Sequence, residues 1–256
     1  MSATLELVKQ LREETDAPYG ECVKALKDAN DDLSKAKELL HERGKATTRT
    51  ALPEQGRIVI VEKDGVMVLV GAKCETDFAA NSEAMTKTLT RLGEALLAQQ
   101  PGDPIGDAKA ALQGSLRENI EMLPGYRREQ GEGGTQHAYY LHHDGKRAAI
   151  VFYNGDDADA ARKVAIQVVA MKPEKLSREH MNQEELKALI DAEIETALNA
   201  GKPAAVAAKI AEGKLASKLK EIVLLEMPMY DDAKQTVGAF VKSKGIEIVA
   251  YTNVAV

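Results

Sequence analysis

Apolar residues recur every three or four positions in three separate groups within the first 45 residues. This spacing places the apolar side chains of each group on one face of a helix. The groups are Leu5, Val8 and Leu11; Cys22, Ala25, Leu26 and Ala29; and Leu33, Ala36, Leu39 and Leu40. Asp31 or Asp32 can cap the third helix, and Gly44 is expected to end it. The pattern predicts a bundle of three short helices over residues 1–45 and a linker over residues 46–56.

The next stretch changes to strand-like runs before it returns to helical spacing. Runs rich in β-branched residues at 57–61 and 66–73 are joined through Asp64 and Gly65, a pair typical of a tight β-hairpin. Two helical stripes follow, one made of Met85, Leu89, Leu92 and Leu96 and the other of Ala108, Leu112, Leu116 and Ile120. We therefore predict a first α+β lobe over residues 57–130.

A second α+β lobe is predicted over residues 131–173 and 221–256, because the order strand, strand, helix repeats there. The strands are expected at 135–141 and 147–153, and the helix carries Ala161, Val164, Ala165 and Val168. Residues 222–225, a helix near 232–243 and a closing strand at 246–251 are expected to complete the lobe. Between the two parts, a helical hairpin with a corner at Gly201-Lys202-Pro203 is predicted over residues 174–220, starting from a capping box at Asn182 and Glu185.

Residues 74–80 join the second strand of the first hairpin to the first helix of its lobe. Thr76 or Asp77 can accept hydrogen bonds from the free N–H groups of a helix start, and Asn81 or Ser82 offers a second cap. Phe78 stands outside the apolar stripe of that helix. Its spacing is compatible with a hydrophobic staple, in which the ring folds back on the first turn, and also with a side chain presented to a partner.

The charge balance bears on the class of partner. The 256 residues include 34 Lys and Arg against 40 Asp and Glu, which gives a net charge of −6. A basic stripe that would neutralise phosphates is missing, so direct nucleic-acid binding is disfavoured. Neither an apolar run of membrane-spanning length nor a signal-peptide pattern is found. Cys22 and Cys74 fall in different predicted modules, which fits a reducing cytoplasm better than a disulfide framework.

Candidate chemistry within the chain itself is sparse. Histidine and cysteine do not occur at zinc-ligand spacings, and His142 and His143, neighbours at a strand end, are expected to point to opposite faces. The phosphate-loop pattern is absent, so no bound nucleotide is expected. Cys22 lies on an apolar stripe, and Cys74 lacks a nucleophile frame. We therefore expect no metal, no cofactor, no catalytic residue and no enzymatic chemistry of the chain's own.

The segment Thr76-Asp77-Phe78-Ala79 resembles the Thr-Asp-Phe-Val signature of the elongation factor Ts family, with Ala79 in place of the usual valine. Residues 7–12 and 22–26 are similar to the N-terminal module of that family. Residues 142–147, 201–203 and 224–238 resemble further landmarks in the same order. Glu118-Asn119-Ile120 resembles another, although a longer gap than is usual separates it from Arg127 and Arg128.

The resemblance implies a fold, a partner and a set of contacts. The fold is α+β, with a ubiquitin-associated-like three-helix head and two lobes, the second interrupted by the helical hairpin. The partner is elongation factor Tu, a GTPase whose GDP the family releases by disturbing its magnesium and nucleotide site. The contacts implied are Lys9, Arg12, Tyr19 and Lys24 in the head; Thr76, Asp77, Phe78 and Ala79 near the partner's nucleotide; and His142, His143 and Arg147 in the second lobe.

An alternative function is an adaptor, whose ubiquitin-associated-like head binds another helix-bearing protein without nucleotide exchange. Loss of Phe78 would be tolerated by an adaptor, whereas an exchange factor would lose rate. The family also uses the hairpin region for dimerisation, so the resemblance implies that a weak homodimer can form through residues 174–220. Tyr19 and Gly20 depart from the family, which often has two methionines at these positions. Met227 and Met229 also depart from it, since glutamine and phenylalanine are common there.

Overall fold

The computed structural model describes residues 5–15, 17–45 and 52–256. Contacts divide the chain into two compact units. The first unit comprises residues 1–130, 141–147 and 255–256, and the second comprises residues 131–140 and 148–254. Most of the predicted linker, residues 46–51, lies outside the described residues. Helices and sheets are mixed in the α+β manner that the sequence predicts.

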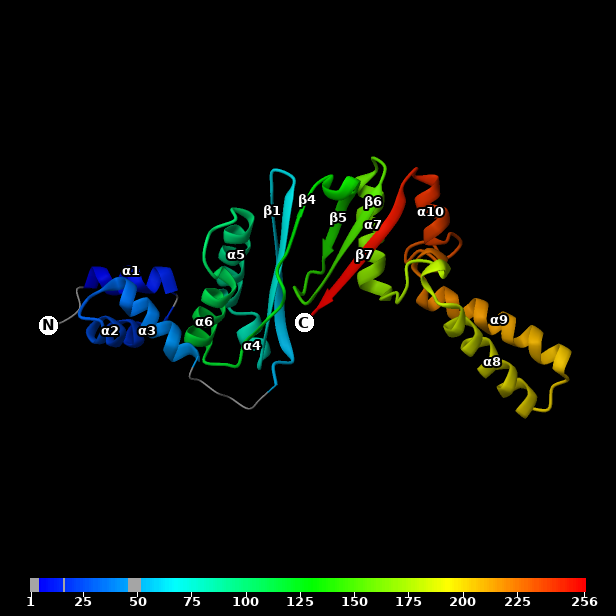
Figure 1. Cartoon of the computed structure of the whole chain (residues 1–256), viewed down its shortest axis with the longest axis horizontal. Helices are drawn as coiled ribbons and strands as arrows, with labels where there is room; N and C mark the ends of the chain where they lie inside the picture. The colour runs from blue at the N-terminus through cyan, green and yellow to red at the C-terminus, as the bar shows by residue number, and fades with distance from the viewer. Residues whose placement is uncertain (1–4, 16, 46–51) are drawn as a thin grey trace. The chain divides into compact units, whose positions relative to one another are not determined.

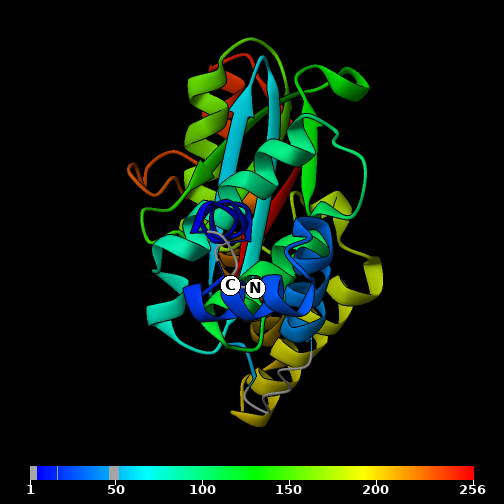
Figure 2. The same ribbon diagram turned by 90° about the vertical axis from the view of Figure 1, so that its left-hand side faces the viewer.

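The N-terminal bundle consists of α1 (Leu5–Thr15), α2 (Tyr19–Asp28) and α3 (Leu33–Lys45), drawn in blue in Figures 1 and 2. Its buried residues come from the predicted stripes and include Val8, Leu11, Cys22 and Leu26. The backbone N–H of Lys35 donates to Asp32 Oδ1 at 3.1 Å, so Asp32 caps α3 as expected. Gly44 does not end α3, which continues to Lys45.

The sheet of the first unit is built on the predicted hairpin. β1 (Gln55–Lys63) pairs antiparallel with β2 (Val66–Cys74), and Lys63 lies opposite Val66 across a two-residue turn. Asp64 and Gly65 have φ angles of 52° and 76°. Positive φ at both positions is what a type I′ turn requires, and Asp-Gly accommodates it with little strain.

Helices cover one side of this sheet. α4 (Asp77–Ala80) is a single turn, α5 (Glu83–Leu97) packs against β1 and β2, and α6 (Pro104–Leu116) packs against α5 (Figure 1). The core between them contains Val68, Val70, Met85, Leu89 and Leu112. Ile120 is also buried in this core. The predicted helical stripe included Ile120, but α6 ends at Leu116, so Ile120 lies beyond the helix.

Two short strands were not predicted. β3 (Glu121–Met122) and β4 (Tyr126–Glu129) pair antiparallel with successive parts of β2. Met122 lies opposite Ala72, and Tyr126 lies opposite Leu69. Their sequences are too short and too charged to show strand alternation, so their pairing with β2 decides their conformation.

The second unit contains a three-stranded sheet in the order β5 (Gln136–Leu141), β6 (Arg147–Asn154), β7 (Glu247–Ala255). α7 (Ala158–Met171) and α10 (Val237–Ser243) pack against each other and share a core with the sheet. Asp157 caps α7 by accepting a hydrogen bond from the Ala160 N–H at 2.9 Å. Residues 222–225, expected to resume the lobe, enter a 3₁₀ turn, η3 (Leu224–Glu226). Thr236 caps α10 by accepting a hydrogen bond from the Ala239 N–H at 3.2 Å.

The predicted helical hairpin is formed by α8 (Gln183–Asn199) and α9 (Ala204–Ile222). They pack against each other, and Gly201, with a φ of 75°, forms the corner. The side chain of Glu185, half of the expected capping box, lies outside the described residues. At the base, the Leu224 N–H donates to the Lys175 carbonyl at 2.9 Å and Leu176 is buried in the core of the unit. Arg178 also pairs with Glu226.

Candidate functional site

The segment with the Thr-Asp-Phe-Ala signature forms the start of α4. Thr76 is the N-cap, in extended conformation, and its Oγ1 accepts a hydrogen bond from the Ala79 N–H at 3.2 Å. This bond satisfies one of the N–H groups that a helix start leaves without an intrahelical partner. The predicted cap at Thr76 is therefore confirmed.

Phe78 points away from the core of its own unit. Ala79 and Ala80 are buried in that core, whereas Phe78 has 85% of its surface exposed. A staple residue would pack on the first turn of the helix, so the staple interpretation of Phe78 is wrong. Because one face of a single helical turn is taken by two buried alanines, Asp77 and Phe78 are left on the exposed side.

The end of α4 is held by a second set of polar contacts. Asn81 Nδ2 donates to the Asp77 carbonyl at 2.9 Å, and Arg57 Nη1 on β1 donates to Asn81 Oδ1 at 3.3 Å. Ser82 then caps α5 by accepting from the Met85 N–H at 3.1 Å. The predicted second cap is thus Ser82. α4 is a defined turn between two capping residues that lie six positions apart.

A buried carboxylate approaches the start of α4 from a distant part of the chain. Glu118, which is 9% exposed, follows α6. Its Oε2 accepts from the Glu75 and Thr76 N–H groups at 2.9 and 3.1 Å, and its Oε1 accepts from Thr76 Oγ1 at 2.6 Å. Sequence reasoning did not connect Glu118 with this site. The resemblance of residues 118–120 to a family landmark was the one available signal.

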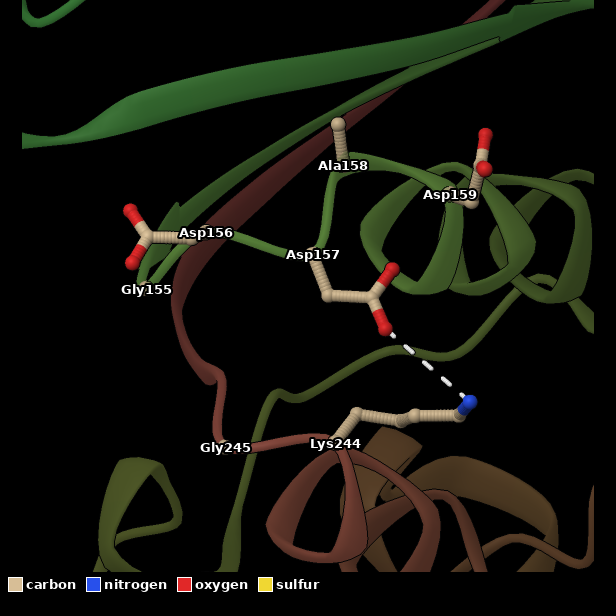
Figure 3. A pocket seen from close by; sticks show the side chains of 7 residues that line it. All are labelled: Gly155, Asp156, Asp157, Ala158, Asp159, Lys244 and Gly245. Carbon is tan, nitrogen blue, oxygen red and sulfur yellow. Dashed lines mark ion pairs between the residues drawn. The ribbon is translucent and has the colours of Figure 1, made fainter.

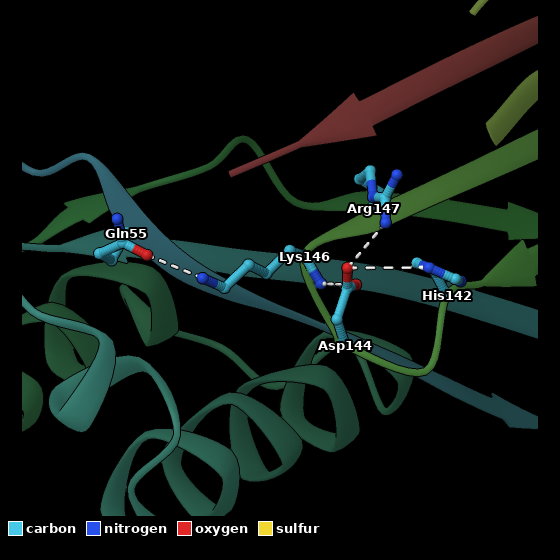
Figure 4. Close-up of polar contacts among 5 residues, drawn as sticks. All are labelled: Gln55, His142, Asp144, Lys146 and Arg147. Carbon is cyan, nitrogen blue, oxygen red and sulfur yellow. Dashed lines mark hydrogen bonds and ion pairs between the residues drawn. The ribbon is translucent and has the colours of Figure 1, made fainter. Parts of the chain in front are cut away.

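The turn at residues 142–147 is organised around Asp144 (Figure 4). The Asp144 carboxylate accepts from the Lys146 N–H at 2.8 Å and from Arg147 Nη2 at 2.9 Å, and it lies 3.8 Å from His142 Nε2. Burial acts to raise the pKa of Asp144, but the Lys146 N–H, the Arg147 guanidinium and His142 outweigh it, so the pKa lies below its usual value.

The histidines of this turn do not point to opposite faces. The ring centroids of His142 and His143 lie 4.2 Å apart in an edge-to-face arrangement. The prediction assumed that β5 continues through both residues, but the strand ends at Leu141 and the chain turns immediately afterwards. The pair therefore forms one aromatic contact within the turn.

Contacts of this turn group it with the first unit. The Ile58 N–H donates to the Gly145 carbonyl at 2.7 Å, and Lys146 Nζ donates to Gln55 Oε1 at 2.7 Å (Figure 4). A Cβ added to Gly145 would lie 3.4 Å from Arg57 Cζ. Arg57 thus contacts both this turn and the residue that ends α4, which brings two of the three predicted contact groups to one strand.

The third predicted group lies on the N-terminal bundle. Lys9 and Arg12 are exposed residues of α1, whose buried residues are Val8 and Leu11. Tyr19 and Lys24 are exposed residues of α2, and Tyr19 retains 52% of its surface. These side chains are available for contact with another molecule.

Both cysteine thiols are buried. Burial, followed by the charge of Glu118, raises the pKa of Cys74 to about 11, and burial raises the pKa of Cys22. At neutral pH such thiols stay protonated and are poor nucleophiles. Their positions support the core interpretation made from the sequence.

Comparison with known proteins decides the family. A family model described as "Elongation factor TS" matches residues 75–256, which begin beside the capped turn of α4. The chain belongs to the elongation factor Ts family. Elongation factor Ts of Thiobacillus denitrificans is 35% identical to this chain, over 97% of this chain and 90% of the relative. The protein of that name from Vibrio parahaemolyticus is 32% identical over 100% of this chain and 92% of the relative.

The remaining surface features of this chain give weaker indications of a functional site. An open depression in the second unit is lined by Gly155, Asp156, Asp157, Ala158, Asp159, Lys244 and Gly245. Only Asp157 points to Lys244 there, at 3.9 Å (Figure 3), and its other oxygen caps α7. Among the residues described, His, Cys, Asp and Glu side chains form no group of three or more that could hold a metal ion. In the same residues, every helix is too short or too polar to cross a bilayer.

Proposed function

We propose that this chain binds elongation factor Tu in the cytoplasm and promotes release of its GDP, with Phe78 acting as the group inserted beside the partner's magnesium and nucleotide site. Family membership supports the partner and the exchange activity. The exposure of Phe78 supports the wedge role. A large apolar ring that is 85% exposed in the free protein gains most when a partner covers it.

α4 presents this ring on a single turn whose two ends are held by hydrogen bonds from the Ala79 N–H to Thr76 Oγ1 and from Asn81 Nδ2 to the Asp77 carbonyl. Asp77 lies beside Phe78 on the same exposed side. A wedge of this kind weakens the binding of GDP to the partner because the Mg²⁺ bound with it requires near-octahedral oxygen geometry. A small displacement of the groups around the metal therefore weakens its bond to the diphosphate that it bridges.

The remaining contact groups are proposed to supply the grip. Lys9, Arg12, Tyr19 and Lys24 would hold the GTPase domain through the N-terminal bundle, and His142, His143 and Arg147 would contact another domain of the partner. All seven residues are exposed or partly exposed. In this arrangement grip and release are performed by different residues, so they can be separated by mutation.

The test is release of a fluorescent GDP analogue from elongation factor Tu at increasing concentrations of this protein. We expect the release rate to rise with concentration to a maximum. In this assay Phe78→Ala tests the wedge, and Met171→Ala is its matched control. Met171 is also an exposed apolar residue, 46% exposed, but it lies at the end of α7 and outside the proposed contacts. Absence of any acceleration of release would contradict the exchange function and would leave the adaptor function, in which the head binds another helix-bearing protein.

A further inference from the structure

Glu118 and Glu75 form a reciprocal contact between two connections that are distant in sequence. Glu118 accepts from the Glu75 and Thr76 N–H groups, and Glu75 Oε1 in turn accepts from the Asn119 N–H at 2.8 Å. The first connection leads from β2 into α4, and the second leads from α6 into β3. The residues joined by these bonds are 42 to 44 positions apart.

The hydroxyl of Thr76 transmits this contact to α4. It donates to Glu118 Oε1 at 2.6 Å and accepts from the Ala79 N–H at 3.2 Å. A hydroxyl has one hydrogen and two lone pairs, and its hydrogen rotates to suit its partners. When the carboxylate takes the hydrogen, the lone pairs are turned toward the helix N–H groups. Glu118 therefore orients the cap of the turn that carries Phe78.

We infer that Glu118 is a positioning residue for nucleotide exchange, which fixes the conformation of residues 75–77 so that Phe78 is held outward before the partner binds. This inference rests on the proposed wedge role of Phe78. Glu118 does not itself reach the partner, since it is buried at 9% exposure. Its effect on exchange passes through the Thr76 cap.

A carboxylate satisfies all three donors that converge here in their present orientation. Both of its oxygens are acceptors, and three N–H or O–H groups point at them. Glutamine has the same shape but replaces one acceptor oxygen with an NH₂ donor. In Glu118→Gln the amide oxygen can keep the two N–H bonds only if the NH₂ group faces Thr76 Oγ1. The hydroxyl must then accept instead of donate, its hydrogen loses its acceptor, and the charge-assisted bonds to the two N–H groups become weaker neutral ones.

The experiment compares the wild type, Glu118→Gln, Phe78→Ala and the double variant in the GDP-release assay. We expect Glu118→Gln to lower the maximal release rate about fivefold or more, while the concentration at half-maximal rate changes less than about twofold, because the gripping residues are intact. Hydrogen exchange at the Glu75 and Thr76 amides should become faster. Glu83→Gln is the control, since Glu83 is an exposed carboxylate of α5 that forms an ion pair with Lys87 at 2.8 Å.

The double variant separates positioning from a general structural effect. If Glu118 acts through Phe78, Glu118→Gln slows release no further in a Phe78→Ala background. Equal slowing in both backgrounds would overturn the inference, as would an unchanged maximal rate in Glu118→Gln. If Glu118→Gln does not fold, Thr76→Val removes the bond from Thr76 Oγ1 to Glu118, together with the cap bond from the Ala79 N–H, and is subject to the same criteria. Failure of the wild type to release GDP would contradict the proposed function instead.

Discussion

Phe78→Ala isolates the proposed wedge because the side chain contributes little to the fold. With 85% of the residue exposed, truncation should change the free energy of unfolding by less than about 0.5 kcal/mol. In the complex the ring would become covered, and burying a phenylalanine contributes about 1.5–3 kcal/mol. A loss of about 2 kcal/mol of this contribution corresponds to roughly thirtyfold in a rate or equilibrium constant. We therefore expect a GDP-release rate at saturating factor that is roughly thirtyfold lower.

Thermodynamic linkage supplies a second measurement on the same variant. If the factor weakens GDP binding by a given ratio, GDP weakens factor binding by that ratio. The wild type should therefore bind nucleotide-free elongation factor Tu more tightly than GDP-bound Tu, and Phe78→Ala should reduce this difference. Calorimetry or surface plasmon resonance with both forms of the partner measures it. The reasoning would be refuted by unchanged release kinetics, or by an equal loss of affinity for both forms.

Three further outcomes are expected. The pKa of Asp144 is lower in the folded protein than in the unfolded chain, so the ionised carboxylate stabilises the fold above about pH 4, and this contribution is lost as the pH falls through the native pKa. The difference in unfolding free energy between wild type and Asp144→Asn should therefore shrink from about pH 6 to pH 3. Cys74 should react with iodoacetamide at neutral pH only after denaturation, and fast alkylation of the native protein would contradict its burial. Replacing residues 188–213 of the hairpin by a short glycine linker should leave a folded protein with most of its exchange activity, measured by circular dichroism and GDP release, because the base contacts at Leu176 and Leu219 remain.

The same hairpin bears on self-association. Leu198 and Val206, near its corner, are 45% and 43% exposed, whereas Ala197, Ala207 and Ala211 are buried. Alanine contributes little apolar area, and about 25 cal/mol per Å² over a small patch does not offset the cost of association. The expected homodimer through residues 174–220 stays a prediction, and it should dissociate at low concentration in sedimentation experiments.

Local interactions were determined by the sequence itself. Asp64 and Gly65 specify the hairpin, since few other residue pairs adopt two successive positive φ angles. Thr76, Ser82 and Asp157 cap helices through bonds that reach only three residues along the chain. Such contacts depend on residues that the sequence already places together, so they were predictable without knowledge of the fold. The resemblance to the elongation factor Ts family, which the comparisons confirm, likewise rests on residues that are close together in the sequence, such as Thr76 to Ala79.

The tertiary structure decided how that segment is presented. Phe78 points outward because Ala79 and Ala80 occupy the core. The spacing of residues within one helical turn does not show which side of that turn faces the core. The role of Glu118 depended on α6 ending where its carboxylate meets the start of α4, 42 residues away in the chain. β4 likewise exists because β2 offers it an unpaired edge. In each case the deciding partner is distant in sequence, and only the folded chain brings its hydrogen-bonding groups or apolar surface into contact.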